Sequence, residues 1–95
     1  RFRLILDTAP AVIYSLDNKG KFVFANKATA SFYGYSIFDL KGKLASEIIE
    51  PVDSSLMKVL NMFLSDNARQ MSKVVDAYDS HKMKCVMEMS FVKFH

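Results

Sequence analysis

The side chains that could carry acid–base, redox or metal chemistry are few in this sequence and stand apart from one another. Two histidines, His81 and His95, and one cysteine, Cys85, occur among 95 residues. His81 lies in a polar run at residues 79–82, where we interpret it as a solvated turn residue rather than an acid–base group. No glycine-rich phosphate loop, H-E-x-x-H or G-x-S-x-G motif is present, and the carboxylates show no pairing pattern. We therefore expect a non-catalytic domain.

The single cysteine limits both redox and metal chemistry. Cys85 has no second cysteine with which to form an internal disulfide, and its surroundings have no metal-ligand spacing. It opens an apolar segment, so we interpret it as a buried, inert thiol rather than a redox sensor. This cysteine usage favours a cytoplasmic location and predicts no metal site.

Composition describes one ordinary globular domain. Hydrophobic residues make up 51% of the chain and charged residues 24%, a balance typical of a folded core. The net charge of +3 comes from 13 basic and 10 acidic residues that are mixed along the chain, so we expect no nucleic-acid partner. No apolar run approaches the roughly 20 residues that span a bilayer, and no signal-peptide pattern opens the sequence. We therefore expect no direct membrane insertion.

A tight turn early in the chain predicts a β-hairpin. Asp17 and Asn18 favour local bonds to the backbone, and Gly20 accepts a positive φ, so residues 17–20 can join strands at 11–16 and 22–25. Asn26 then stands where its side chain can accept from the free N–H groups of a following helix. We therefore predict Asn26 as an N-cap.

Glycines and caps divide the next segment into short helices. Gly34, followed by Tyr35, ends the first helix, and Ser36 with Asp39 forms a capping-box-like start for a second helix that Gly42 ends. Tyr33 and Tyr35 on either side of Gly34 are predicted to pack rather than to bind a ligand.

Three further helices are predicted from apolar spacing. Residues 1–8 form an entry helix that stops before Pro10, and residues 44–50 form a short helix that stops before Pro51. Asp53 or Ser54 caps a longer helix whose apolar stripe continues to residue 64.

The last third of the sequence changes to the period of a strand. Residues 73–78 and 85–94 are rich in β-branched, aromatic and methionine side chains, and the polar residues 79–82 connect them. Cys85, Met87, Met89 and Phe91 share one strand face, which we expect to face the core. Two strands, several helices and two strands predict an α+β domain, with the helices on one side of an antiparallel sheet.

This order of elements resembles the PAS domain family. The resemblance is carried by D-x-x-G-x-F-x-x-x-N from Asp17 to Asn26 and by G-Y-S-x-x-D-L-x-G from Gly34 to Gly42, while the C-terminal half agrees in element order and apolar pattern. It covers essentially the whole chain, residues 1–95, as one domain. The family is a sensor and interaction module, which implies a signalling role rather than catalysis.

The resemblance also implies a fifth, central strand, whereas this sequence stops at His95 just after the fourth. We expect either that the sequence is a piece of a longer chain or that a strand is missing or supplied by another chain. Residues 85–94 would then present an unpaired central edge carrying Met87, Met89 and Phe91, which would invite association.

Relatives of this kind have a pocket between the helices and one face of the sheet, which holds a ligand or is filled by side chains. Each of these residues also has an interpretation as ordinary core, which is the more common role for such side chains. The predicted walls are Tyr14, Leu16, Phe22, Val23, Phe24, Phe32, Met57, Leu60, Phe63, Met87, Met89 and Phe91.

The resemblance permits two named cofactors to be tested against this sequence. Flavin photosensors of the family carry a reactive cysteine just after the glycine that closes the second short helix, but here Gly42 is followed by Lys43 and Leu44. Haem-binding relatives offer a histidine from the long helix, and residues 54–64 contain none. Flavin photochemistry and haem are therefore disfavoured, which leaves a small apolar metabolite or no ligand.

Two functions from different classes follow from the resemblance. In the first, a small ligand binds in the pocket and an attached effector, such as a histidine kinase, cyclase or transcription regulator, reads the change in conformation. In the second, side chains fill the pocket, and the domain pairs with itself or another PAS domain through its outer sheet face and entry helix. Phe22, Val23 and Phe24 favour this pairing slightly, because three consecutive apolar residues place apolar groups on both faces of a strand.

Overall fold

The computed structural model describes residues 11–94, so the predicted entry helix at 1–10 lies outside the described residues. The described elements agree in type and order with those expected from the sequence, and the third strand begins three residues earlier than predicted. Their bounds are β1 Val12–Asp17, β2 Phe22–Ala25, α2 Lys27–Tyr33, α3 Ile37–Leu40, α4 Ala45–Ile49, α5 Ser54–Ser65, β3 Gln70–Tyr78 and β4 Lys84–Phe94.

The strands form one four-stranded sheet in the order β2-β1-β4-β3. The pairs β1–β2 and β3–β4 are antiparallel, as expected, but β1 and β4 run parallel from Val12 opposite Met89 to Asp17 opposite Phe94. The α+β class is confirmed, and the prediction of a wholly antiparallel sheet is corrected to a mixed sheet. The parallel pair arises because two antiparallel hairpins, distant in sequence, meet side by side with their inner strands in the same direction.

The position of β4 also corrects the expectation of an unpaired central edge. β4 pairs with β1 on one side and with β3 on the other, from Tyr78 opposite Lys84 to Gln70 opposite Val92. Both rows of its backbone groups are therefore engaged over its second half, from Met89 onward, while its first half pairs with β3. β2 and β3 form the edges of the described sheet.

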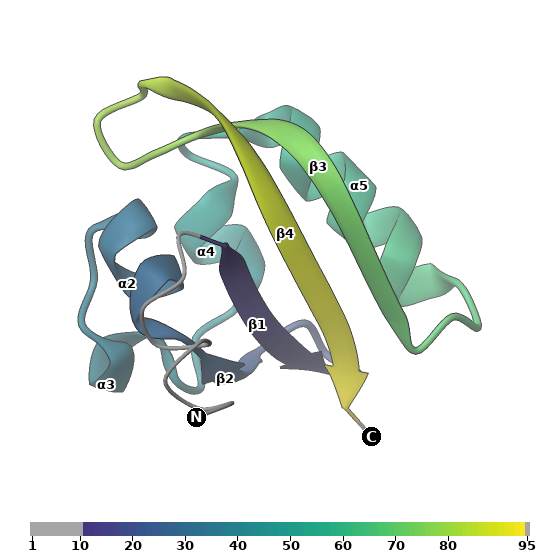
Figure 1. Cartoon of the computed structure of the whole chain (residues 1–95). Coiled ribbons are helices and arrows are strands. Elements are labelled where there is room, and N and C mark those ends of the chain that lie inside the picture. The colour runs from purple at the N-terminus through teal and green to yellow at the C-terminus, as the bar shows by residue number, and fades with distance from the viewer. Residues whose placement is uncertain (1–10, 95) are drawn as a thin grey trace, which may run out of the picture.

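The helices cover one face of the sheet, as predicted, with α5 behind β3 and β4 and the shorter helices behind β1 and β2 (Figure 1). The core lies between these two layers. It contains Val12, Tyr14, Leu16, Phe22, Ala25, Ala30, Phe32, Tyr33, Leu40, Ala45, Ile48, Ile49, Leu56, Met57, Leu60, Phe63, Ala77, Met89 and Phe91.

The first hairpin closes as its turn residues predict. The Asp17 carboxylate accepts from the N–H groups of Lys19 and Lys21, each at 2.9 Å, and Gly20 has a φ of 83°. Those two hydrogen bonds, that from Lys21 first, lower the pKa of Asp17. The ionised side chain therefore fixes the turn that sets the register of β1 and β2.

The predicted N-cap is confirmed and does more than cap. Asn26 Oδ1 accepts from the N–H of Thr29 at 2.9 Å, and its Nδ2 donates to the carbonyl of Ala11 at 3.0 Å. Thr29 Oγ1 in turn donates to the Ile13 carbonyl at 2.9 Å. Because these bonds join α2 to β1, Asn26 fixes the angle at which the helix leaves the sheet.

The two short helices that follow have the predicted boundaries. Gly34 ends α2 in the left-handed region with φ 77°, and the N–H of Tyr35 donates to the Ala30 carbonyl at 2.9 Å. Ser36 caps α3 by accepting from the N–H of Asp39 at 3.1 Å, and Gly42 follows that helix with a positive φ.

An irregularity in β2 corrects one inward prediction. The register shifts between Ser15 opposite Phe24 and Leu16 opposite Phe22, so the strand carries one extra residue there. Strict alternation would place Phe22 and Phe24 on the same face, but Phe22 is buried and Phe24 is 45% exposed. The side chain of Phe24 is therefore outside the core.

The inward face of β4 is as predicted where the structure describes it. Met89 and Phe91 are buried, and Cys85 is half-buried against the core. The side chain of Met87 lies outside what the structure describes.

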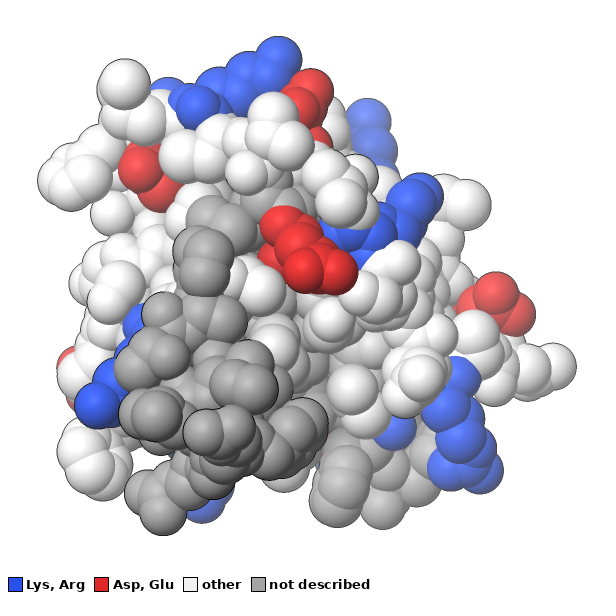
Figure 2. Space-filling model, viewed as in Figure 1, with Lys and Arg blue, Asp and Glu red and all other residues white. Residues whose placement is uncertain are grey.

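Acidic and basic groups are interspersed among the described residues on the face shown in Figure 2. None of the described helices is long and apolar enough to cross a membrane.

Candidate functional site

The predicted pocket walls converge between the sheet and the helices. Nine of the twelve predicted wall residues are buried together. Val23 and Phe24 are partly exposed, and the side chain of Met87 lies outside what the structure describes. The buried candidates are Tyr14, Leu16, Phe22, Phe32, Met57, Leu60, Phe63, Met89 and Phe91. Their assignment as ligand contacts stays a prediction.

Aromatic rings fill much of this interior. The ring of Tyr14 packs edge-on against Phe22 and Phe91, with 5.2 Å between ring centroids in each case. Phe63 from α5 approaches Phe91 at 6.2 Å. Pairs of this geometry stabilise a core beyond the area that they bury, so the sheet and α5 are joined by direct side-chain contact at this point.

Two tyrosine hydroxyls interrupt this apolar packing. The hydroxyl oxygens of Tyr14 and Tyr33 are buried and have no hydrogen-bond partner among the described residues. Burial raises the pKa of the Tyr14 phenol well above its usual range, and Tyr33 and Asp53 nearby raise it further. Burial and then Asp53 likewise raise the pKa of Tyr33. Both groups are therefore neutral hydrogen-bond donors at physiological pH.

Asp53 is a buried carboxylate whose charge acts on both of these hydroxyls. Its Oδ1 caps α5 by accepting from the Leu56 N–H at 3.0 Å, and its Oδ2 accepts from the Tyr78 N–H at 3.0 Å. The sequence predicted the cap at residue 53 or 54 but missed the bond to the end of β3. That bond connects residues 25 apart, and no local pattern encodes it.

Lys93 is a second feature that sequence reasoning missed. It is 8% exposed, and its Nζ donates to the carbonyls of Phe63 at 3.1 Å and Asp66 at the C-terminal end of α5. The ammonium also lies 5.3 Å from the centre of the Phe63 ring. A signal was available, because Lys93 continues the inward alternation of Met89 and Phe91. The lysine adds a donor to the carbonyls of the last turn of α5, where the helix has few N–H groups of its own left to supply. The Phe63 carbonyl also accepts from the N–H of Asp66, at 3.2 Å.

The surface of the described residues includes three cavities that are lined by residues other than Tyr14, Tyr33 and Asp53. The widest, about 830 Å³, is a groove between the C-terminal half of α5 and the start of β3. A second, about 190 Å³, lies over Ser72 and Ser90, whose hydroxyls are 3.0 Å apart.

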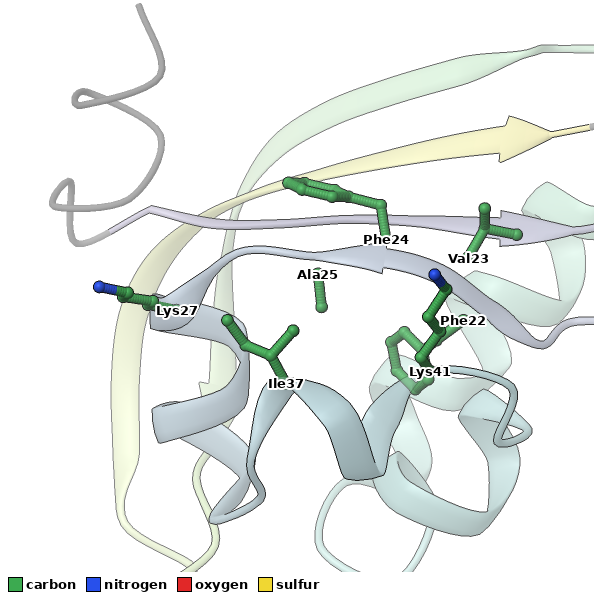
Figure 3. A pocket seen from close by; sticks show the side chains of 7 residues that line it. All are labelled: Phe22, Val23, Phe24, Ala25, Lys27, Ile37 and Lys41. Atoms are coloured by element: carbon green, nitrogen blue, oxygen red, sulfur yellow. The ribbon is translucent and has the colours of Figure 1, made fainter.

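The third cavity, about 350 Å³, lies between β2 and α3 (Figure 3). Ile37 points from α3 toward the strand, while Lys41 extends from the end of α3 beside Phe22. The sequence treated α3 only as a connecting helix and did not predict this pocket. Its lining residues are Phe22, Val23, Phe24, Ala25, Lys27, Ile37 and Lys41.

The residues first considered for chemistry stay apart in the structure. His81 is exposed in the β3–β4 turn, where its N–H donates to the Asp79 carboxylate at 2.9 Å. Within residues 11–94, no group of three histidine, cysteine, aspartate or glutamate side chains could hold a metal ion.

Comparison with known families gives one result. The family model described as PAS domain matches residues 1–72, about three quarters of the chain. No curated protein and no solved structure matches the chain.

Proposed function

The chain belongs to the PAS domain family, whose members are generally non-catalytic sensor or interaction modules, and on this premise we propose that it is a sensory domain. In this proposal a small molecule with a hydrogen-bond acceptor enters the interior between sheet and helices. A covalently attached effector domain then responds to its presence.

The two hydroxyls without partners carry the proposal. A buried hydroxyl without a hydrogen bond costs about 1–3 kcal/mol, so a core retains two of them at a cost unless something accepts from them. Tyr14 stands on β1 and Tyr33 on α2, at opposite layers of the interior. A ligand with one acceptor atom would accept hydrogen bonds from both hydroxyls, one in each layer. Its apolar part would contact the aromatic rings around Tyr14.

The contacts of Asp53 supply a route by which such a guest changes the rest of the domain. Its carboxylate lies near both hydroxyls and holds the start of α5 and the end of β3. A guest that accepts from Tyr14 or Tyr33 alters the field at Asp53. The bond to Tyr78 then changes in strength, and the β3–β4 hairpin responds. A ligand that binds two arrangements of this contact with different affinities shifts their populations.

The first test is mass spectrometry of the purified protein, under non-denaturing and then denaturing conditions. We expect an extra mass that is lost on denaturation, absent from Tyr14→Phe and Tyr33→Phe, and retained in Tyr35→Phe. Tyr35 is the matched control because its side chain is partly exposed, outside the core. Thermal unfolding should show Tyr14→Phe and Tyr33→Phe to be less stable than Tyr35→Phe, because only Tyr35→Phe retains the stabilising ligand.

Two outcomes would contradict the sensory proposal. If the protein carries no extra mass and Tyr14→Phe is as stable as the parent, the hydroxyl has no partner in solution. If the protein carries no extra mass and both variants are destabilised, an ordered water is the partner.

A second candidate function, pairing through the outer sheet face, is favoured by a separate observation. Val74 on β3 and Val86 on β4 are 69% and 73% exposed, and Phe24 contributes further apolar surface on β2. A second copy of the chain, or another PAS domain, would bury these side chains. Sedimentation of the parent and of Val86→Lys tests this candidate. A parent that sediments as a monomer at high micromolar concentration would contradict it.

A further inference from the structure

The pocket between β2 and α3 combines an apolar wall with basic side chains. Its volume of about 350 Å³ is within the range of small-ligand sites, and Val23, Ala25 and Ile37 supply apolar surface. In Figure 3 the two lysines stand at opposite ends of the pocket, with Ile37 between them. This pocket lies outside the interior that the sensory proposal uses, and the ring of Phe22 forms part of the wall between the two.

The charge of the pocket is of one sign. Lys27 and Lys41 line it, no acidic residue does, and neither lysine forms an ion pair with a carboxylate among residues 11–94. Both side chains are exposed and can reorient. An anionic group placed here would gain a charge-assisted hydrogen bond without breaking an existing ion pair.

The backbone at this edge of the sheet argues for a small molecule rather than an added strand. Phe22 already donates to the carbonyl of Lys43 and accepts from the N–H of Gly42, both at 2.9 Å, and Lys21 bridges to Leu44. Because Ala25 lies opposite Tyr14 between hydrogen-bonded pairs, its own N–H and C=O face the outer edge of the sheet. Together with the irregularity at Val23, this leaves an edge too short and too uneven to hold an extended peptide.

We propose that this pocket binds a small organic carboxylate with an apolar body. The carboxylate pairs with Lys41, and Lys27 adds to the positive potential from the other end. The apolar body lies against Ile37 and Val23. The binding groups proposed here, Lys41 and Lys27, differ from the hydroxyls of Tyr14 and Tyr33 that the sensory proposal uses, so either proposal can fail without the other.

A titration followed by two-dimensional ¹⁵N–¹H NMR tests the site, with hexanoate as the probe and hexanamide as its neutral isostere. Hexanoate should give saturable shifts at the amides of Ala25, Lys27, Ile37 and Lys41, and hexanamide should bind more weakly. Lys41→Gln should weaken hexanoate binding about tenfold, the factor expected when one charge-assisted hydrogen bond is lost. Lys58→Gln, which removes the same charge from the exposed side of α5, should leave the affinity unchanged.

The apolar half of the site has its own test. Ile37→Ala should weaken hexanoate and hexanamide by a similar factor, because it removes a contact with the body that both probes share. The spectra themselves establish that each variant is folded.

Four outcomes would overturn the proposal. Equal affinity for hexanoate and hexanamide would show that the charge of the ligand does not contribute to binding. An unchanged hexanoate affinity in Lys41→Gln would show that the Lys41 side chain does not bind the carboxylate. Hexanoate shifts centred at Tyr14 and Tyr33 would assign the ligand to the interior. Binding of an acidic extended peptide in place of hexanoate would mean that the edge accepts a strand after all.

Discussion

Residues 12–40 are joined by side chains that reach at most 16 residues along the chain, whereas residues 53–94 depend on two side chains that reach 25 and 30 residues. In the first region Asp17, Asn26 and Ser36 bond to nearby backbone groups. In the second, Asp53 and Lys93 join α5 to the two long strands. Local hydrogen bonds therefore determine much of the geometry of the N-terminal region. The geometry of the C-terminal region depends on contacts between segments that are distant in sequence.

This difference explains where the family resemblance is strongest. A side chain that bonds within a few residues requires a given residue type at a given spacing, which appears as a motif. A side chain that bonds across 30 residues only has to be long enough and to point inward. The motif residues lie in the first region, while Lys93 carries no motif at all.

We expect the largest effect from Asn26→Ala, which tests whether local hydrogen bonds organise the N-terminal region. The change removes the cap of α2 and the bond to Ala11, and it leaves buried backbone groups without partners. We expect a loss of about 3 kcal/mol in the free energy of unfolding, measured by urea titration. Asn18→Ala, in the exposed turn, should cost less than about 0.5 kcal/mol. Equal effects of the two changes would mean that the cap does not organise this region.

Lys93→Met tests the other region. It keeps the aliphatic length but removes the ammonium that donates to the carbonyls of Phe63 and Asp66, and Phe63 then keeps only the N–H of Asp66. We expect a loss of about 2 kcal/mol and faster hydrogen exchange in the last turn of α5 than in β1 and β2. Lys58→Met, on the exposed side of α5, is the control. Uniformly faster exchange throughout the domain would show that the two regions do not respond separately.

Alkaline pH probes the buried tyrosines. Burial raises the pKa of Tyr14 above that of the unfolded chain, near 10, so the folded state retains the proton longer. Stability from this group is complete below pH 10 and falls as pH rises above it, by about 1.4 kcal/mol per pH unit. The free energy of unfolding of the parent should therefore fall steadily relative to that of Tyr14→Phe from pH 10 to 11. A constant difference would mean that the hydroxyl is accessible to water.

Besides the pairing of β1 with β4, the two regions approach each other at Gly34, which makes a substitution there informative. A Cβ at Gly34 would lie 3.0 Å from the Cβ of Ser80 in the β3–β4 turn, and a Cβ at Gly42 would meet nothing within 4 Å. Both glycines have positive φ, so alanine costs about 1 kcal/mol at either site. Gly34→Ala should cost more than Gly42→Ala in thermal unfolding. Equal costs would mean that the turn moves freely away from α2.

Acid pH gives the smallest effect. Hydrogen bonds to Asp17 lower its pKa, so its contribution to stability is present above the unfolded value, near 4, and is lost as pH falls further. Asp17→Asn should make the stability of the domain less sensitive to pH between 4 and 2. An unchanged pH profile would mean that the turn holds without its charge.

Much of the fold was predictable because its signals are local. The turn at Asp17, the caps at Asn26 and Ser36 and the period of β4 each depend on neighbours in sequence. The parallel pairing of β1 with β4 was not predictable from pattern, because both strands would show the same alternation in either direction. Phe24 was misplaced for a related reason, since one extra residue in β2 reverses the alternation without leaving a mark in residue type.

The sequence by itself determined the elements, their order, the apolar faces outside β2 and the family, because propensity, capping and periodicity act over a few residues. Only the tertiary structure decided which hydroxyls lack partners, which carbonyls Lys93 reaches and how α3 and β2 enclose a pocket. These features depend on the distances between segments that are far apart along the chain. Such distances are set when the layers pack, and no short run of residues encodes them.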